Sequence, residues 1–301
     1  MNPSQRQPGF ALLISLVLVL IAGVVLAGVA RRSMLDAVQT RSNVEELQRH
    51  WATISLQETL LPRVEAILQT AERPQVARRD NEPQTAVPHP KLTIHCRLND
   101  IDYELILTDE QSKLNANSLA KGSGPNTVQR QLDTLIRQAV TDRTKRRKVN
   151  PRPLPGTEST TPFGGFDQLF ESLQVEALLA RQRSLGLSDV VTLWGNGMVH
   201  AHRSSPAVIR TACTPKLPDD TIDQFINTRD TDRSLDLAGI LAKMDDLDDK
   251  QMSVIPKLLT ESSTCHGLWI IANGDLRSWH TLTIGEGGGS GTITQRYNFA
   301  W

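Results

Sequence analysis

Cysteine, aromatic residues and net charge are all scarce in this sequence of 301 residues. The three cysteines, Cys96, Cys213 and Cys265, form no CxxC pair and are too few for a dense disulfide framework. In an oxidising compartment they allow one disulfide and one leftover thiol, and the sequence does not choose the pair. Lysine plus arginine and aspartate plus glutamate both number 33, so no overall positive field favours nucleic acid.

Motifs for catalysis and phosphate binding are also missing. No nucleophile-elbow motif surrounds any serine. The glycine loop 285–291 has no Lys-Ser/Thr pair and leads into a predicted strand, so it does not fit a phosphate cradle. His200 and His202 lie two residues apart on a predicted strand and could share one face as zinc ligands, with Cys265-His266 or His280. An anchored metalloenzyme therefore stays an alternative.

A long apolar run stands out near the amino end. Residues 10–30 carry no charge, and these 21 residues would form a helix of about 31 Å, which matches the hydrocarbon core of a bilayer. The run is longer than the apolar region of a secretory signal, and no small-residue cleavage site follows it. A short polar leader with Arg6 precedes it and ends in Gly9. The sequence predicts a transmembrane helix, with a plain signal anchor as the alternative.

Charges at the ends of the run do not fix its orientation. Arg31 and Arg32 follow it, whereas only Arg6 precedes it. The positive-inside rule would leave the carboxyl side cytoplasmic or undecided.

An amphipathic helix is predicted to continue the run into solvent. Apolar residues between 34 and 72 are mostly three or four apart, too irregularly for sustained heptads. Pro62 removes one internal hydrogen bond and predicts a kink or break.

Alternating apolar residues predict strands at both ends of the remaining chain. The runs 92–98 and 101–107 flank Asn99-Asp100 and indicate a β-hairpin. Further strands are expected at 190–194, 198–201, 266–272, 279–284 and 292–301. Helices are expected at 125–140, 166–184, 217–229, 235–247 and 251–260, with another that starts at Ser204 or Ser205 before Pro206. The basic cluster 143–148 lacks interleaved aromatics, which favours a solvated or lipid-facing loop over a nucleic-acid site.

The junction Gly9-Phe10, between a basic leader and an apolar helix, resembles the processing site of type IV pilins and type II secretion pseudopilins. The resemblance implies that a prepilin peptidase cleaves after Gly9 and methylates the new amino terminus at Phe10. Most relatives carry a glutamate at mature position five, where this chain has Ile14. Absence of that carboxylate resembles the general secretion pathway protein K family, whose members sit at the filament tip.

Internal motifs extend the resemblance over nearly the whole chain. Residues 109–117, Asp-Glu-Gln-Ser-Lys-Leu-Asn-Ala-Asn, are similar to a D-E-x-x-K-L-N-x-N signature of protein K relatives. Trp194-Gly195-Asn196-Gly197 and the later Ser-x-Pro-x-x-Ile also match in order. Relatives commonly have Asn-x-Asn-Thr after that glycine turn, and this chain has His200-Ala201-His202-Arg203 instead.

The resemblance implies an α+β fold: a pilin-like long N-terminal helix packed on a small antiparallel sheet, with a large helical insertion. The expected segments are a prepilin leader at 1–9, a transmembrane helix at 10–30, its amphipathic extension at 31–73, a sheet from 91–117, 190–203 and 266–301, and helical segments at 118–189 and 204–265.

The function it implies is that of a minor pseudopilin without catalysis, anchored in the bacterial inner membrane with its body in the periplasm. The implied partners are minor pseudopilins of the I and J type, the major pseudopilin, the prepilin peptidase and the inner-membrane assembly platform. Calcium is an expectation from the family. The acidic run 245–249 could bind it, although a solvated helix end is the default interpretation of that run. A minor pilin of a type IV pilus, with a priming or adhesive role, is the other alternative.

Overall fold

The chain divides into two compact units, Met1–Ile54 and Ser55–Trp301. The computed structural model describes residues 8–72, 90–99, 101–121, 124–140, 142–144, 146–153, 162–179, 185–214, 216–244, 247–274, 278–288 and 292–300. Helix α1 (Pro8–Leu60) begins in the first unit and ends in the second; its part in the first unit carries the apolar run, and the side chains from Leu12 to Val29 are all exposed. Among the described residues it is the one helix long and apolar enough to cross a membrane.

The predicted break at Pro62 is confirmed. α1 ends at Leu60, the 3-10 turn η1 spans Leu61–Arg63, and α2 (Val64–Glu72) follows. Proline cannot donate the backbone hydrogen bond that an uninterrupted α-helix needs at this position. The break leaves Leu61, Val64 and Leu68 as the buried face of this segment.

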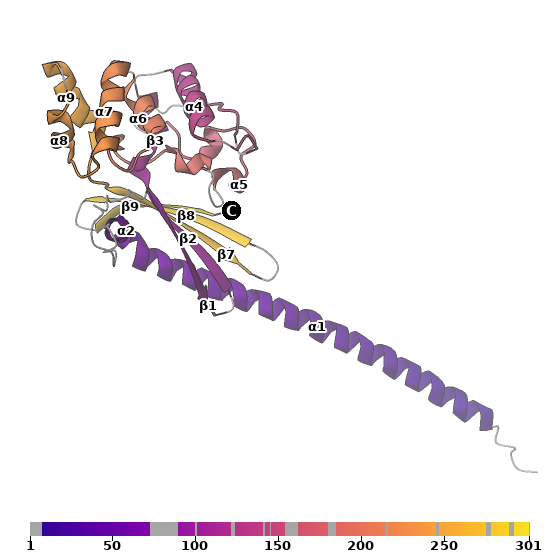
Figure 1. Ribbon diagram of the computed structural model, residues 1–301. Helices are drawn as coiled ribbons and strands as arrows, with labels where there is room; N and C mark the ends of the chain where they lie inside the picture. The colour runs from indigo at the N-terminus through magenta and orange to yellow at the C-terminus, as the bar shows by residue number, and fades with distance from the viewer. Residues whose placement is uncertain are drawn as a thin grey trace, which may run out of the picture. The chain divides into compact units, whose positions relative to one another are not determined.

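A five-stranded antiparallel sheet forms the centre of the second unit (Figure 1), in the order β1-β2-β7-β8-β9. Its strands are β1 (Lys91–Leu98), β2 (Ile101–Asp109), β7 (Cys265–Asn273), β8 (Ser278–Gly288) and β9 (Thr292–Ala300). The predicted hairpin is confirmed, with Asn99 at φ 54°, a left-handed conformation that asparagine tolerates. Asp100 lies outside the described residues.

Both faces of the sheet are covered. Tyr103, Leu105 and Leu107 alternate with Ile106 along β2, and all four are buried. η1 and α2 pack on β2, β7 and β8, whereas Ile106 and Trp269 join the core of the helical part. Burial on two faces explains why the central strand, β7, has an unbroken apolar run from Leu268 to Ala272.

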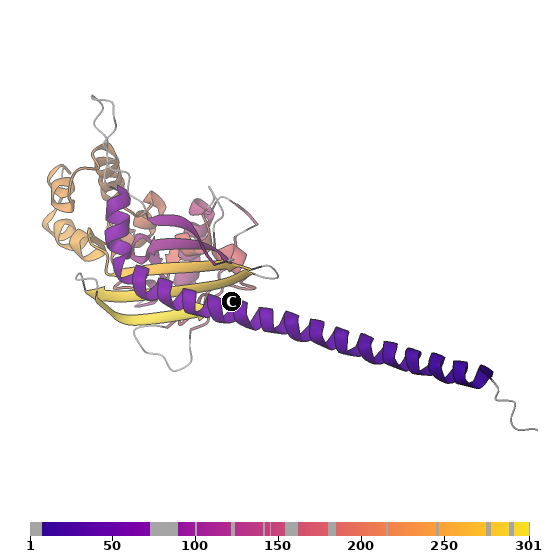
Figure 2. The same cartoon turned by 90° about the horizontal axis from the view of Figure 1, so that it is seen from below.

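Helices between residues 116 and 258 gather on one side of the sheet, as both Figures 1 and 2 show. They are α3 (Ala116–Ala120), α4 (Pro125–Ala139), α5 (Val175–Leu178), α6 (Pro206–Cys213), α7 (Asp219–Thr231), α8 (Leu237–Ala242) and α9 (Asp249–Leu258). The predicted start of α6 is confirmed, because the Ser205 hydroxyl accepts a hydrogen bond from the Val208 amide and Pro206 opens the first turn.

Two predictions of secondary structure are wrong. The segment 166–184 is not one helix: it holds only the 3-10 turn η3 (Phe166–Gln168) and α5 in its described part. Ser172, at φ 51°, interrupts the helical backbone between them. The apolar residues of 166–184 have helical spacing because they are buried in a loop, in which Phe166 stacks on Phe170.

Residues 190–203 do not join the sheet. They hold two short strands, β4 (Val191–Thr192) and β5 (Val199–His200), which pair in parallel with β3 (Leu114–Asn115) and β6 (Leu259–Thr260). The predicted turn between them is present, with Gly195 at φ 90° and Gly197 at φ 85°. The two glycines reverse the chain direction, but β4 and β5 pair with β3 and β6 and not with each other.

Candidate functional site

The predicted processing residues lie at the start of α1. Gly9 and Phe10 belong to its first turn, and Phe10 is 67% exposed. Ile14, one turn later, is 44% exposed. Processing and methylation at Gly9 and Phe10 stay predictions.

The signature Asp109–Asn117 lies where β2 leaves the sheet and the helical part begins. Asp109 caps the 3-10 turn η2 (Glu110–Ser112), because its Oδ1 accepts a hydrogen bond from the Gln111 amide at 2.8 Å. The same oxygen accepts the Ser263 hydroxyl at 2.6 Å. A fully buried carboxylate thus fixes the turn and the chain segment before β7.

Glu110, the first residue of η2, forms a buried ion pair with Lys113. Glu110 also accepts hydrogen bonds from Thr108 at 2.7 Å and from Thr192 of β4 at 2.6 Å. Gly267 of β7 makes room for this group, since a Cβ there would meet Glu110 Oε1 at 2.5 Å. All polar atoms of the Glu110 carboxylate are therefore satisfied in a site that excludes water.

Amide side chains complete the signature. Asn117 donates to the carbonyls of Phe163 at 3.0 Å and Leu193 at 2.7 Å, and accepts from the Phe163 amide at 2.9 Å. Asn115 donates to the Trp194 carbonyl at 2.8 Å and caps α3 through the Ser118 amide at 3.0 Å. The two asparagines thus bind the loop that contains Phe163 and the loop that contains Leu193 and Trp194, neither of which holds a long helix or strand.

A second set of charges, the Arg203 cluster, consists of Arg203, Glu65, Glu72, Asp109 and His266. Arg203 makes paired hydrogen bonds to Glu65, at 2.7 and 3.1 Å, and to Glu72, at 2.7 and 3.0 Å. It also donates to Asp109 Oδ2 at 3.1 Å. His266 of β7 lies 2.9 Å from Glu65. One buried guanidinium therefore ties α2 to the signature and to the turn before α6.

Burial and charge act in opposite directions on this cluster. Burial alone would raise the pKa of Glu65, but hydrogen bonds from His266 and Arg203 outweigh it and hold that pKa well below its usual value. Burial alone would lower the pKa of Arg203, yet its bonds to Glu72 and Glu65 raise that pKa instead. The ion pairs are thus maintained at any pH near neutrality.

Backbone bonds hold the turn that presents Arg203. His200 Nδ1 accepts from the amides of His202 at 3.3 Å and Arg203 at 3.2 Å, so this nitrogen carries no proton. Burial lowers the pKa of His200 more than the nearby Asp109 charge raises it. Arg229 donates to the carbonyls of Ala201 and Ser204 at 3.0 and 2.9 Å. His200 therefore serves the turn as a hydrogen-bond acceptor.

The histidines do not assemble with a cysteine into a metal centre. The rings of His200 and His202 are 6.5 Å apart, and His202 lies 3.6 Å from Glu261. Over the described ranges, no three His, Cys, Asp or Glu side chains are grouped to hold a metal ion. The geometry thus lends nothing to the metalloenzyme alternative.

Only part of the acidic run 245–249 can be located. Asp245 and Asp246 lie outside the described residues, while Asp248 caps α9 by accepting from the Gln251 amide at 2.6 Å. Calcium therefore remains a prediction.

All three cysteines are free thiols in the structure. Burial raises the pKa of Cys213 to about 12 and that of Cys265 well above its usual value. Neither thiol is activated for nucleophilic chemistry.

The basic segment behaves as a capped loop in its described part. Arg146 donates to the carbonyls of Val140 and Arg137, and Lys148 pairs with Glu171 at 3.4 Å. Lys145 lies outside the described residues.

Sequence reasoning located the signature but not the Arg203 cluster. Glu65 and Glu72 are seven residues apart, and thus share one face of the predicted amphipathic helix. Because the same face also carries buried leucines, the two carboxylates indicate that a cation is buried against this helix. Nothing in the sequence identifies Arg203 as that cation.

Comparison with solved structures gives a distant likeness. No protein-family model matches the chain, and no curated protein matches it. A chain in the crystal structure of the GspK-GspI-GspJ complex from the enterotoxigenic Escherichia coli type 2 secretion system is similar in arrangement. The two are 14% identical, with a TM-score of 0.47 over 87% of this chain and 99% of that chain. A likeness this distant assigns neither a family nor a residue role.

Proposed function

We propose that this chain is a minor pseudopilin of a type II protein secretion system. The observation that carries the proposal is the join at Gly9-Phe10 between a basic leader and a charge-free helix, which continues as α1 beyond the apolar run to Leu60. From Leu61 onward, the same spine packs on an antiparallel sheet, with Leu61, Val64 and Leu68 buried. Anchor, spine and sheet are the parts that a subunit of a pilin-like filament needs.

Within the filament we assign the chain to the tip. An ionised carboxylate in a bilayer or an apolar helix bundle costs several kcal/mol unless it is paired. A subunit at the tip has no neighbour above it that could pair with such a carboxylate. This chain has Ile14 at that position and so carries no carboxylate there. The helices of residues 116–258 add bulk on one side of the sheet, and we expect this bulk to block addition of a further subunit.

The proposed partners and location follow from this role. The apolar part of α1 would leave the inner membrane and bundle with the helices of the I-type, J-type and major pseudopilins. The second unit would lie in the periplasm and support the export of folded proteins. The proposed processing enzyme is the prepilin peptidase, and the inner-membrane platform would drive assembly.

The first test is the intact mass of the protein purified from bacterial membranes. The proposal expects a chain that begins at Phe10 and carries one added methyl group. A Gly9→Leu variant is the control, because the altered junction should leave the leader attached. An unprocessed wild-type chain, or cleavage after Ala30, would refute the proposal.

A further inference from the structure

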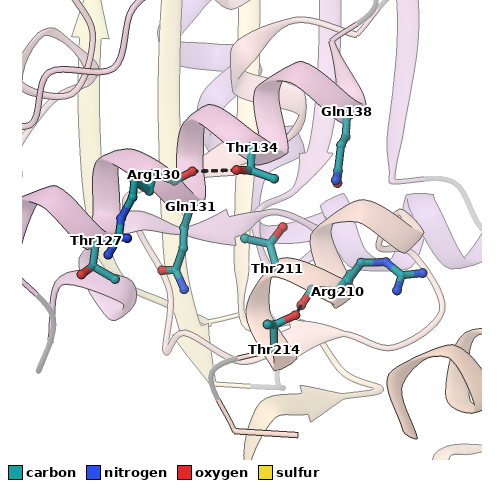
Figure 3. Close-up of a pocket in the computed structure, with 8 residues that line it drawn as sticks. All are labelled: Thr127, Arg130, Gln131, Thr134, Gln138, Arg210, Thr211 and Thr214. Atoms are coloured by element: carbon teal, nitrogen blue, oxygen red, sulfur yellow. Dashed lines mark hydrogen bonds between the residues drawn. The ribbon is translucent and has the colours of Figure 1, made fainter. Parts of the chain in front are cut away.

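The depression between α4 and α6, on the helical part of the second unit, is lined by threonines that bond within their own helices (Figure 3). The hydroxyls of Thr134 and Thr214 donate to carbonyls four residues earlier, at 2.9 and 2.8 Å. Thr211 does the same at 2.8 Å. These three hydroxyl protons are already bonded within the protein, whereas α1 in the first unit leaves large apolar side chains uncovered.

Three large apolar side chains of α1 are exposed beyond the predicted transmembrane run. Val44 is 48% exposed, Leu47 57% and Trp51 60%. Their spacings of three and four residues place them on one face of the helix. Single exposed apolar residues are ordinary on a protein surface, but a row of them on one face indicates contact with another protein.

The row belongs to a longer stripe of α1 that no charge interrupts. Small uncharged residues extend it at alternating spacings of four and three, all within the first unit: Ser33, Ala37, Thr40, Val44, Leu47, Trp51 and Ile54. Seven acidic or basic residues lie between 31 and 54, and none falls on this stripe. The alternation is the heptad pattern of a helix that packs along another helix. Large apolar residues alone do not reveal it, because three positions hold serine, alanine and threonine.

Charges beside the stripe fit a second copy of this chain. Two copies anchored by residues 10–30 have the same orientation in the membrane, so their helices can pair only in parallel. Asp36 and Arg41 border the stripe on its two sides, and both are exposed. Residues of this kind, five apart, meet across a parallel pair, and two-fold symmetry makes the contact twice. Arg41 pairs with Glu45 of its own helix at 3.5 Å, so Asp36 of the second copy would add a further carboxylate to it.

We propose that two copies of this chain pair in the membrane through this stripe of α1. Within the transmembrane run the same spacing continues through Gly23, Leu26 and Ala30, and small residues there let two helix backbones approach closely. Ser33 and Thr40 bury less apolar area than leucine would, so the pairing is reversible. The inference does not rest on the pseudopilin role, because it concerns the anchored chain alone. In a pseudopilin, the same face would pass from the second copy to other subunits on assembly.

The test is disulfide cross-linking of the full chain in membranes of a host that lacks other secretion proteins. Thr40→Cys places a thiol on the stripe. Ser42→Cys is the matched control, because it places an exposed thiol at a similar height on the opposite side of α1. Both carry Cys96→Ser, which removes the half-buried native thiol. With copper phenanthroline, the Thr40→Cys chain should form dimer at least about tenfold faster, because pairing raises the effective concentration of its thiol.

Charge exchange separates pairing from a change in fold. Asp36→Arg brings two arginines together across the pair and should slow cross-linking at position 40 about fivefold, as expected when two exposed ion pairs are lost. Adding Arg41→Asp should restore the rate. Equal rates for the stripe and the control overturn the proposal, and so does a double variant that stays as slow as Asp36→Arg alone. A product of another mass, formed only when other secretion proteins are present, would assign the stripe to a different subunit and also overturn it.

Discussion

At the scale of single residues, Arg203 is a buried cation that pairs with three carboxylates. We expect Arg203→Ala to lower the free energy of unfolding by about 3–5 kcal/mol, because the buried Asp109 and the partly buried Glu65 and Glu72 would lose their shared cation. Urea unfolding of the full chain in micelles, followed by circular dichroism, measures the change. Arg233→Ala is the control: this arginine is more exposed and pairs only loosely with Asp230, at 3.7 Å, so its loss should cost under about 1 kcal/mol. Equal costs for the two variants would contradict the account.

The pKa shifts near Arg203 predict how stability depends on pH. His200 has a lowered pKa in the folded state, so its contribution is complete above the unfolded value of about 6.5 and declines as the pH falls below it. Glu65 also has a lowered pKa, so its contribution is complete above about 4.3 and declines below that. Stability should therefore fall in two stages on acidification.

His200→Asn tests the first stage. Asparagine offers an acceptor for the amides of His202 and Arg203 but does not titrate. Unfolding free energies measured from pH 7.5 to 5 should decrease for the wild type and stay flatter for the variant. Parallel profiles would show that His200 is not the group responsible.

At the scale of elements, Asn117 connects two loops that have little regular structure. Asn117→Ala would leave the buried Phe163 amide and the Leu193 carbonyl without the partner that Asn117 provides. The free energy of unfolding should fall by about 1–3 kcal/mol for each of these groups. Hydrogen exchange at the Phe163 amide should become faster. The control is Asn126→Ala, at an exposed position of α4, which should change neither the free energy of unfolding nor this exchange rate. An unchanged Phe163 amide would mean that other contacts hold the loop.

Sequence patterns predicted those elements whose signals are local. Alternation and Asn99-Asp100 gave the hairpin, Pro62 gave the break, and Ser205-Pro206 gave the start of α6. The segment 166–184 misled because Phe166, Phe170 and Leu173 have helical spacing, and nothing in the composition revealed the left-handed backbone at Ser172.

The candidate site was only half predictable for a related reason. Residues 109–117 form a contiguous motif, so the sequence located them. Arg203 is 138 residues from Glu65 and 94 from Asp109, and a pairing at that separation depends on the folded topology. The prediction that residues 190–203 join the sheet was wrong for the same reason. The strands in this segment pair with β3 and β6, which come from distant parts of the chain.

At the scale of the whole molecule, Ile14 tests the proposed place at the filament tip. Ile14→Glu introduces a carboxylate that, without a partner, costs roughly 2.5–3.5 kcal/mol at bilayer depth. We expect less secreted protein in a strain that depends on this variant, and normal secretion with Ile14→Leu. If secretion were unchanged and the Glu variant were found along the filament, the assignment to the tip would be wrong.

The Arg203 cluster also constrains how sequences of this kind can diverge. One guanidinium balances two carboxylates from α2 and one from the end of β2, so a substitution at any one of these four positions alone passes through a destabilised intermediate. Natural homologues that lack a cation at the position of Arg203 should therefore also lack acidic residues at those of Glu65 and Glu72. Covariation among these positions, rather than conservation of any one, is the evolutionary record that the cluster should leave.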